Sequence, residues 1–186
     1  MSANQFPLPG GLPVPEDDGA ARHLSGMAMP SLVLRSTDGR DVDLSGLDGS
    51  WVLYVYPMTG RPGVALPDGW DAIPGARGCT PQSCGFRDHH AQLRALGYGV
   101  FGASAQDPDY QREARDRLHL PFQLLSDAGL SLKRALGLPT FQVAGMELFK
   151  RLTLIVKDGR ITKVFYPVFP PDQNANEVLA WIGKNA

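Results

Sequence analysis

Residues 78–88, which read Gly-Cys-Thr-Pro-Gln-Ser-Cys-Gly-Phe-Arg-Asp, are the most informative segment of the chain. It contains both cysteines of the 186-residue chain, Cys79 and Cys84. A disulfide between them would close a loop too short to restrict much of the unfolded chain, so a purely structural crosslink explains the pair poorly. Two cysteines next to the start of a helix instead indicate a redox pair.

The residues after Cys79 predict an amphipathic helix over 80–96. Thr80 is a suitable N-cap, and Pro81 suits the first helical position. Apolar side chains then recur at helical spacing, and Gly97 fits the glycine that commonly follows the end of a helix. Cys79 would then lie at or just before the N-terminus of this helix.

This position gives the two cysteines different chemistry. Free N–H groups and the positive end of the helix dipole favour a thiolate at Cys79, and the thiolate is the nucleophile. Cys84 would lie about one turn inside the helix, and helical residues five apart are separated by about 7.5 Å along the axis and about 140° around it. That separation is outside disulfide geometry. A bond between the two therefore requires the first turn to open, which implies a reduced folded state and an oxidised, locally unfolded one.

The residues alone also fit several alternative roles for the cysteine pair. Free cysteines are often buried and inert. Cys79, Cys84, His89 and His90 could together offer a zinc site, although their spacing is irregular for zinc and adjacent helical residues diverge by about 100°. A thiol–disulfide oxidoreductase acting on proteins is another alternative, although such enzymes usually have a Cys-x-x-Cys spacing. A peroxide-responsive redox sensor is a further one.

Residues 78–88 resemble the active site of the Q-type peroxiredoxins, also called the bacterioferritin-comigratory-protein type. In that family a Gly-Cys-Thr-x-x-x-Cys-x-Phe-Arg-Asp run has the peroxidatic cysteine first and the resolving cysteine five positions later. Cys79 matches the former and Cys84 the latter. The resemblance covers residues 30–186. It includes the segments 36–44, 52–57, 100–104, 124–127 and 150–159.

The resemblance implies both a fold and an activity. The fold would be a thioredoxin-like α/β domain, with a central mixed sheet flanked by helices and an N-terminal hairpin. The protein would be a thiol-dependent peroxidase that reduces hydrogen peroxide and organic hydroperoxides. Cys79 and Cys84 would form an intramolecular disulfide, and thioredoxin or a similar dithiol would reduce it. No metal, flavin or haem is expected because the sulfur does the redox chemistry itself. Arg151 would stabilise the thiolate and orient the peroxide.

One departure from the family pattern concerns the peroxide pocket. The family usually has Pro-x-x-x-Thr-x-x-Cys, in which the proline and threonine line the pocket. Here Pro57 is followed by a Pro- and Gly-rich stretch, 58–78. The position three before Cys79 is Ala76, which has no hydroxyl. Thr59 is the nearest hydroxyl after Pro57, so the insertion either displaces the usual threonine or lets Thr59 fold back to replace it. Pro57 and Thr59 are therefore candidate site residues.

The chain divides into an extension, 1–29, and a domain, 30–186. The extension is rich in Pro, Gly, Ala and Asp with little periodicity, so we expect it to be partly flexible. The domain contains the inserted loop 58–78, and a loop of that length is usually functional. The predicted hairpins are 31–44 and 152–166, the strands 51–56 and 98–103, and the helices 108–118 (with Asp107 as cap), 130–136 and 174–182, while 139–146 is expected to be a loop.

Composition and charge limit the partners. The formal net charge is −1, from 18 basic and 19 acidic residues, so electrostatics favour neither nucleic acid nor a membrane surface. The longest apolar run is too short to span a bilayer, and no signal-peptide pattern is visible. Together with a reactive cysteine pair, these features predict a reducing, cytoplasmic location. A monomer or a weak homodimer would suit the family that the chain resembles.

Overall fold

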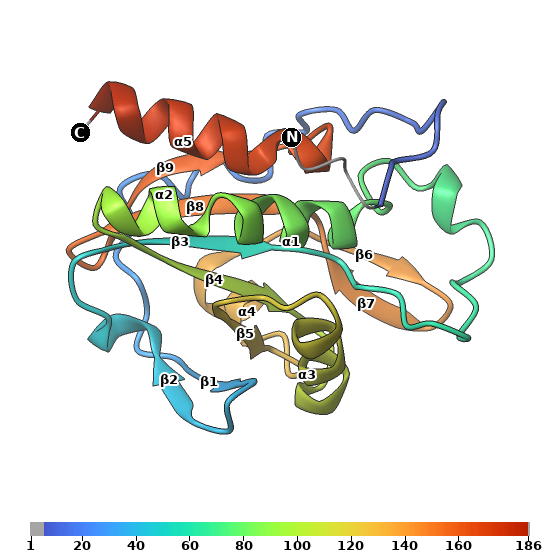
Figure 1. Ribbon diagram of the computed structural model, residues 1–186, viewed down its shortest axis with the longest axis horizontal. Helices are drawn as coiled ribbons and strands as arrows, with labels where there is room; N and C mark the ends of the chain where they lie inside the picture. The colour runs from blue at the N-terminus through green and yellow to red at the C-terminus, as the bar shows by residue number, and fades with distance from the viewer. Residues whose placement is uncertain (1–5, 186) are drawn as a thin grey trace.

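A seven-stranded mixed sheet forms the centre of the computed structural model, which describes residues 6–185 (Figure 1). The strand order is β2-β1-β5-β4-β3-β8-β9. The strands are β1 Val33–Ser36, β2 Asp41–Asp43, β3 Ser50–Val55, β4 Tyr98–Ser104, β5 Gln123–Ser126, β8 Leu152–Lys157 and β9 Arg160–Phe165. β4 pairs in parallel with β3 and β5, whereas the other pairs are antiparallel. The predicted mixed sheet is confirmed.

Helices cover both faces of this sheet (Figure 1). They are α1 Cys79–Asp88, α2 His90–Ala95, α3 Pro108–Arg117, α4 Ser131–Leu136 and α5 Asn174–Asn185, with short 3₁₀ turns η1 Leu44–Gly46, η2 Trp70–Ala72 and η3 Pro171–Gln173. One apolar cluster joins the sheet to α1, α2, α3 and α5, and another joins the opposite face to α4. In the described part of the chain, none of these helices has the length and apolar character that crossing a bilayer requires.

The central strand β3 shows how the sequence specifies the two faces. Its residues 51–55 are all buried. Trp51 and Leu53 belong to the cluster that contains α4, whereas Val52 and Tyr54 belong to the cluster that contains α1. Successive side chains of a strand point to opposite faces, so a strand covered on both sides needs an unbroken apolar run. The run at 51–56 predicted this strand.

Short-range signals for turns and caps also gave correct predictions. The Asp38-Gly39 turn connects β1 to β2, and the Asp158-Gly159 turn connects β8 to β9. The Asp107 carboxylate accepts a hydrogen bond from the backbone N–H of Tyr110 at 2.8 Å and so caps α3. Each of these signals lies within a few residues of the turn or cap that it specifies, so the sequence alone is enough to recognise it.

The predicted active-site helix differs from the structure at its start and in its middle. The helix begins at Cys79, and Gly78 is its N-cap. Thr80 is therefore not the cap, and Pro81 is not the first helical residue. Gly78 has a φ of 110°, a conformation that glycine adopts readily and other residues do not. The helix also divides at His89, where α1 ends and α2 begins.

The segment predicted as a loop at 139–146 instead contributes to a small separate hairpin. Its strands are β6 Thr140–Val143 and β7 Met146–Phe149, which pair antiparallel. Ala144 and Gly145 connect them with φ values of 48° and 75°. Tight hairpin turns usually place Asn-Gly or Asp-Gly at such positions. The alanine removes that signal from the sequence, which is why the hairpin was not predicted.

Residues 6–29 contain no helix and no strand apart from one isolated bridge to β9. Even so, the side chains of Leu24 and Met29 are buried in the cluster that contains α4. The later part of the predicted extension therefore packs as part of the core. Residues 1–5 of that extension lie outside the described residues, and the division at residue 29 stays a prediction.

Candidate active site

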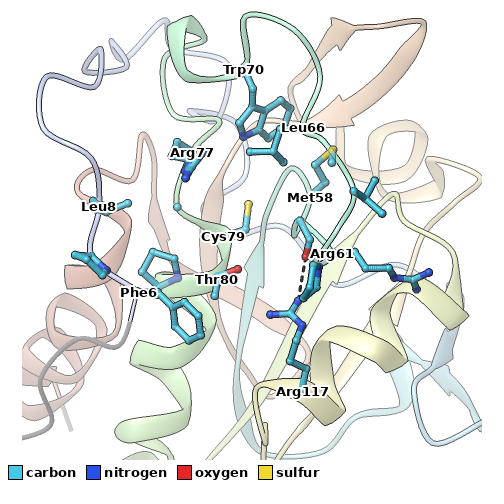
Figure 2. A pocket seen from close by; sticks show the side chains of 16 residues that line it. Phe6, Leu8, Met58, Arg61, Leu66, Trp70, Arg77, Cys79, Thr80 and Arg117 are labelled. Carbon is cyan, nitrogen blue, oxygen red and sulfur yellow. Dashed lines mark hydrogen bonds between the residues drawn. The ribbon is translucent and has the colours of Figure 1, made fainter.

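Cys79 is the first residue of α1 and borders a cavity of about 450 Å³ (Figure 2). Its side chain is buried and its thiol is free. The walls of the cavity come from residues 6–8, from the inserted loop 58–78, from the start of α1 and from Arg117 of α3. A small substrate entering this cavity would therefore meet Cys79.

The backbone at Gly78 fixes where α1 begins. A β-carbon built on Gly78 would lie 2.3 Å from Cγ of Pro171 and 2.9 Å from Cδ2 of Leu8. Both approaches are closer than real carbon atoms make, so a side chain cannot fit without displacement of these neighbours. Glycine therefore serves two purposes here, since it supplies the positive φ and allows close packing around the start of the helix.

Arg151, in the link between β7 and β8, is the predicted site residue that contacts Cys79. Its Nη2 donates to the Cys79 sulfur at 3.2 Å. The residue is only 3 % exposed. The same guanidinium donates to the carbonyl oxygens of residues 75–77 at 3.0 to 3.3 Å, and its Nη1 donates to the side-chain oxygen of Gln82. The structure thus brings Arg151 and Cys79 together, as the sequence predicts.

The hydrogen-bond partners of Arg151 do not balance its positive charge, which lies beside the Cys79 sulfur. The oxygen atoms that Arg151 contacts belong to neutral groups, so they satisfy its N–H groups without balancing its charge. A buried charge without an opposite charge is costly. The Cys79 sulfur is the contacting atom that can become negative. A negative charge on this sulfur would be the natural partner of the guanidinium.

A chain of neutral polar side chains holds the guanidinium in place from behind. Nε2 of Gln82 donates to Oδ1 of Asn174 at 3.0 Å, and the Thr153 hydroxyl donates to the same oxygen at 2.7 Å. All three residues are fully buried. They connect α1, β8 and α5 and orient the Gln82 oxygen toward Arg151. Sequence analysis missed them, and the available signal was Gln82, a polar residue three positions after Cys79 on the same helix face.

Cys84 lies inside α1 and is also a free, buried thiol. It packs with Phe86 and Leu93 in the apolar cluster between the helix and the sheet. Burial raises its pKa above the ordinary value, and the nearby Arg87 charge offsets part of this rise. Cys84 is therefore a protonated thiol at neutral pH, in an environment opposite to that of Cys79.

Pro57 and Thr59 follow the end of β3. Pro57 is buried, and Thr59 is 1 % exposed. The Thr59 hydroxyl donates to Oε1 of Gln106 at 3.2 Å, while the flanking residues Met58 and Gly60 line the cavity. At the position of the family's usual threonine, Ala76 offers its backbone carbonyl, 3.7 Å from the Cys79 sulfur.

The inserted loop and α3 give the cavity a positive rim. Arg61, Arg77 and Arg117 all line it. Arg77 and Arg117 pair with carboxylates at 3.0 Å and 2.6 Å, and Arg61 lies 4.3 Å from the centre of the Tyr110 ring. Arg61 also lies 3.8 Å from a carboxylate oxygen of Glu113, so each guanidinium of this rim has an acidic neighbour.

The two histidines of the zinc alternative are engaged elsewhere. Nδ1 of His89 lies 2.7 Å from Oε1 of Gln92, and the His90 ring packs 5.7 Å from the Phe122 ring. Within residues 6–185, no three side chains of His, Cys, Asp or Glu are grouped so that they could hold a metal ion. The geometry at α1 thus favours thiol chemistry over a structural metal.

Comparison with known proteins agrees with this geometry. Residues 24–179 match the Redoxin family. The chloroplastic peroxiredoxin Q of Oryza sativa subsp. japonica is 30% identical over 185 residues, which cover 96% of this chain and 78% of that protein. The crystal structure of the peroxidoxin BcpB from Mycobacterium tuberculosis matches with a TM-score of 0.70 and 23% identity, over 87% of this chain and 97% of that one. The Xanthomonas campestris bacterioferritin comigratory protein matches with a TM-score of 0.69 and 20% identity, over 88% and 98%.

A thioredoxin-like sheet with a cysteine thiol at the start of a helix and an arginine on its sulfur defines a thiol-based redox protein. The chain belongs to the Redoxin family and, within it, to the Q-type peroxiredoxins. It is therefore a thiol-dependent peroxidase.

Replacing Arg151 with lysine tests the contact with the sulfur. We expect kcat/KM for hydrogen peroxide to fall about 100-fold or more, because a flexible ammonium cannot reproduce a fork that binds both the sulfur and the surrounding carbonyls. The matched control is Arg35→Lys on β1, where an arginine with a half-exposed side chain pairs with Asp41 at 3.2 Å. Circular dichroism would verify that both variants fold. Unchanged kcat/KM in Arg151→Lys would contradict the assignment.

The raised pKa of Cys84 predicts a pH dependence. In a Cys79→Ser variant, the ultraviolet absorbance of the thiolate should appear only above the ordinary cysteine pKa of 9.0. In the unfolded chain the same thiol ionises near 9.0, so the free energy of unfolding should decrease as the pH rises from that value toward the higher folded-state pKa. Urea unfolding of Cys79→Ser beside the Cys79→Ser, Cys84→Ser double variant isolates the contribution. A titration at or below 9.0 would show that burial does not govern this thiol.

Proposed function

We propose that Cys79 is the peroxidatic cysteine of this enzyme and that Arg151 activates it. The observation that supports this most directly is the 3.2 Å contact between Nη2 of Arg151 and the Cys79 sulfur, at the start of a helix and beside a cavity. A thiolate in this position is a nucleophile. The guanidinium can also donate to a peroxide oxygen as negative charge develops on it.

In the first step the Cys79 thiolate attacks the terminal oxygen of a hydroperoxide. The S–O bond forms as the O–O bond breaks, and the remaining oxygen takes a proton and leaves as an alcohol or as water. The sulfur is oxidised to a sulfenic acid and the peroxide is reduced. Apolar side chains such as Met58 and Leu66 line the cavity, so its chemistry suits organic hydroperoxides as well as hydrogen peroxide.

In the second step Cys84 acts as the resolving cysteine. Its thiol condenses with the sulfenic acid, which forms the S–S bond and releases water. Because the two cysteines are five residues apart in α1, the first turn of the helix must open before the sulfurs can bond. Thioredoxin or a similar dithiol then restores both thiols and itself becomes a disulfide. A reducing compartment such as the cytoplasm, and a monomer or weak homodimer, belong to the same proposal.

Single-turnover oxidation followed by intact-mass measurement tests this mechanism. The reduced protein should consume one equivalent of hydrogen peroxide and lose the mass of two hydrogens. Cys79→Ser should consume none, because the nucleophile is absent. Cys84→Ser should complete one turnover, accumulate a sulfenic acid that dimedone traps, and fail to be recycled by thioredoxin. Peroxide consumption by Cys79→Ser at the rate of the unsubstituted protein would overturn the proposal.

We further propose that Pro57 and Thr59 support the bound peroxide. Thr59 is buried and is not itself among the residues that line the cavity, but its neighbours Met58 and Gly60 are. Its hydroxyl donates to Gln106, so a lone pair of its oxygen is left to accept a hydrogen bond from a peroxide that reaches it. Thr59→Val keeps the shape and removes this acceptor. We expect kcat/KM for hydrogen peroxide to fall about tenfold, the effect of losing one hydrogen bond. A near-normal value would exclude Thr59 from the site, and Thr59→Ser should retain most of the activity.

A further inference from the structure

The segment 6–8 lies against the start of α1, next to the reactive sulfur. Phe6, Pro7 and Leu8 line the same cavity as Cys79. In Figure 2, Phe6 and Leu8 lie on one side of Cys79 and Met58 and Arg61 on the other. A stretch of chain more than 70 residues away in sequence therefore forms one wall of the active site.

Leu8 lies against Gly78, the N-cap of the helical turn that must open before a disulfide can form. Its Cδ2 would lie 2.9 Å from a β-carbon on Gly78, and Cγ of Pro171 would lie 2.3 Å from the same point. Farther along α1, Gly85 also lies close to the chain before α5: its β-carbon would be 3.5 Å from the carbonyl oxygen of Asp172. Leu8 and η3 thus both contact the N-cap of α1.

Phe6 adds apolar packing next to Leu8. It is partly buried and packs against the apolar cluster that contains Cys79 and Cys84. Local opening of a helix becomes more difficult when apolar side chains must separate from it. Residues 6–8 therefore stabilise the closed first turn, in which the two sulfurs cannot bond.

We propose that Leu8 is a positioning residue that latches the first turn of α1 and thereby sets the fate of oxidised Cys79. This inference rests on the proposed function. The Cys79 sulfenic acid can condense with the Cys84 thiol, which forms the disulfide and releases water, but only after the turn opens. While the turn stays closed, the sulfenate can instead attack a second hydroperoxide. The sulfur then gains another oxygen and becomes a sulfinic acid, and the hydroperoxide is reduced to an alcohol or water.

A variant pair separates the latch from general effects on the fold. Leu8→Ala removes the contact with Gly78, whereas Leu8→Met keeps an apolar side chain of similar size. The matched control is Leu96→Ala, at the far end of α2, where the leucine is 45 % exposed. Reduced protein would be mixed with hydrogen peroxide and quenched over time, and sulfenic acid, disulfide and sulfinic acid would be quantified by mass.

We expect Leu8→Ala to convert the sulfenic acid to the disulfide about fivefold faster, with a sulfinic fraction that falls in proportion. Because Leu8 also lines the cavity, this step is timed from the sulfenic acid, whatever the rate at which that acid forms. Amide hydrogens of residues 79–83 should exchange faster in reduced Leu8→Ala. Leu8→Met and Leu96→Ala should behave like the unsubstituted protein.

Two outcomes would overturn the inference, and they are distinguishable. An unchanged rate of conversion of the sulfenic acid to the disulfide in Leu8→Ala would overturn the latch alone. Absence of any sulfenic acid in the unsubstituted protein would overturn the proposed function and the latch with it.

Discussion

The buried guanidinium of Arg151 imposes the constraint around which the site is built. A positive charge can remain inside a protein only when its N–H groups are satisfied and its charge is balanced. Backbone carbonyls of residues 75–77 and the Gln82 side chain meet the first requirement, and the Cys79 sulfur meets the second when it is ionised. The burial of Arg151 and its contact with the Cys79 sulfur therefore depend on each other.

The same requirement explains why the inserted loop belongs to the site. Its last residues, 75–77, supply carbonyl oxygens to Arg151, so the loop must end in a fixed conformation before α1 begins. Trp70 and Ala76 are buried in a small apolar cluster with Leu148 of β7, which anchors the rest of the loop. The inserted loop thus supplies both a wall of the cavity and the backbone carbonyl oxygens that accept hydrogen bonds from Arg151.

Sequence reasoning succeeded where the physical signal is local and failed where it is tertiary. The cysteine pair, the continuous apolar run of β3 and the Asp107 cap are each visible within a few residues. Gln82 and Asn174 are 92 residues apart and individually resemble ordinary surface amides, so their contact has no local signature. Gly78 was overlooked as the cap because threonine is the better cap by propensity, whereas the choice depends on packing against distant residues. Arg151 was identified by family resemblance rather than by any pattern of its own.

Under the proposed mechanism, the hydrogen-bonded side chains of Gln82, Asn174 and Thr153, which hold Arg151 in place, link the oxidation state of the two cysteines to the stability of the fold. If the first turn of α1 opens to admit the proposed disulfide, Arg151 loses its contact with the Cys79 sulfur and part of its hydrogen-bonded shell, so the oxidised fold would be less stable than the reduced one. A thermodynamic cycle connects the two properties: any stability that the fold loses on oxidation must reappear as a driving force for reduction. On the proposed mechanism, the disulfide of the folded protein would therefore have a higher reduction potential than that of the unfolded chain, and the hydrogen-bonded shell around Arg151 would favour its reduction by a dithiol.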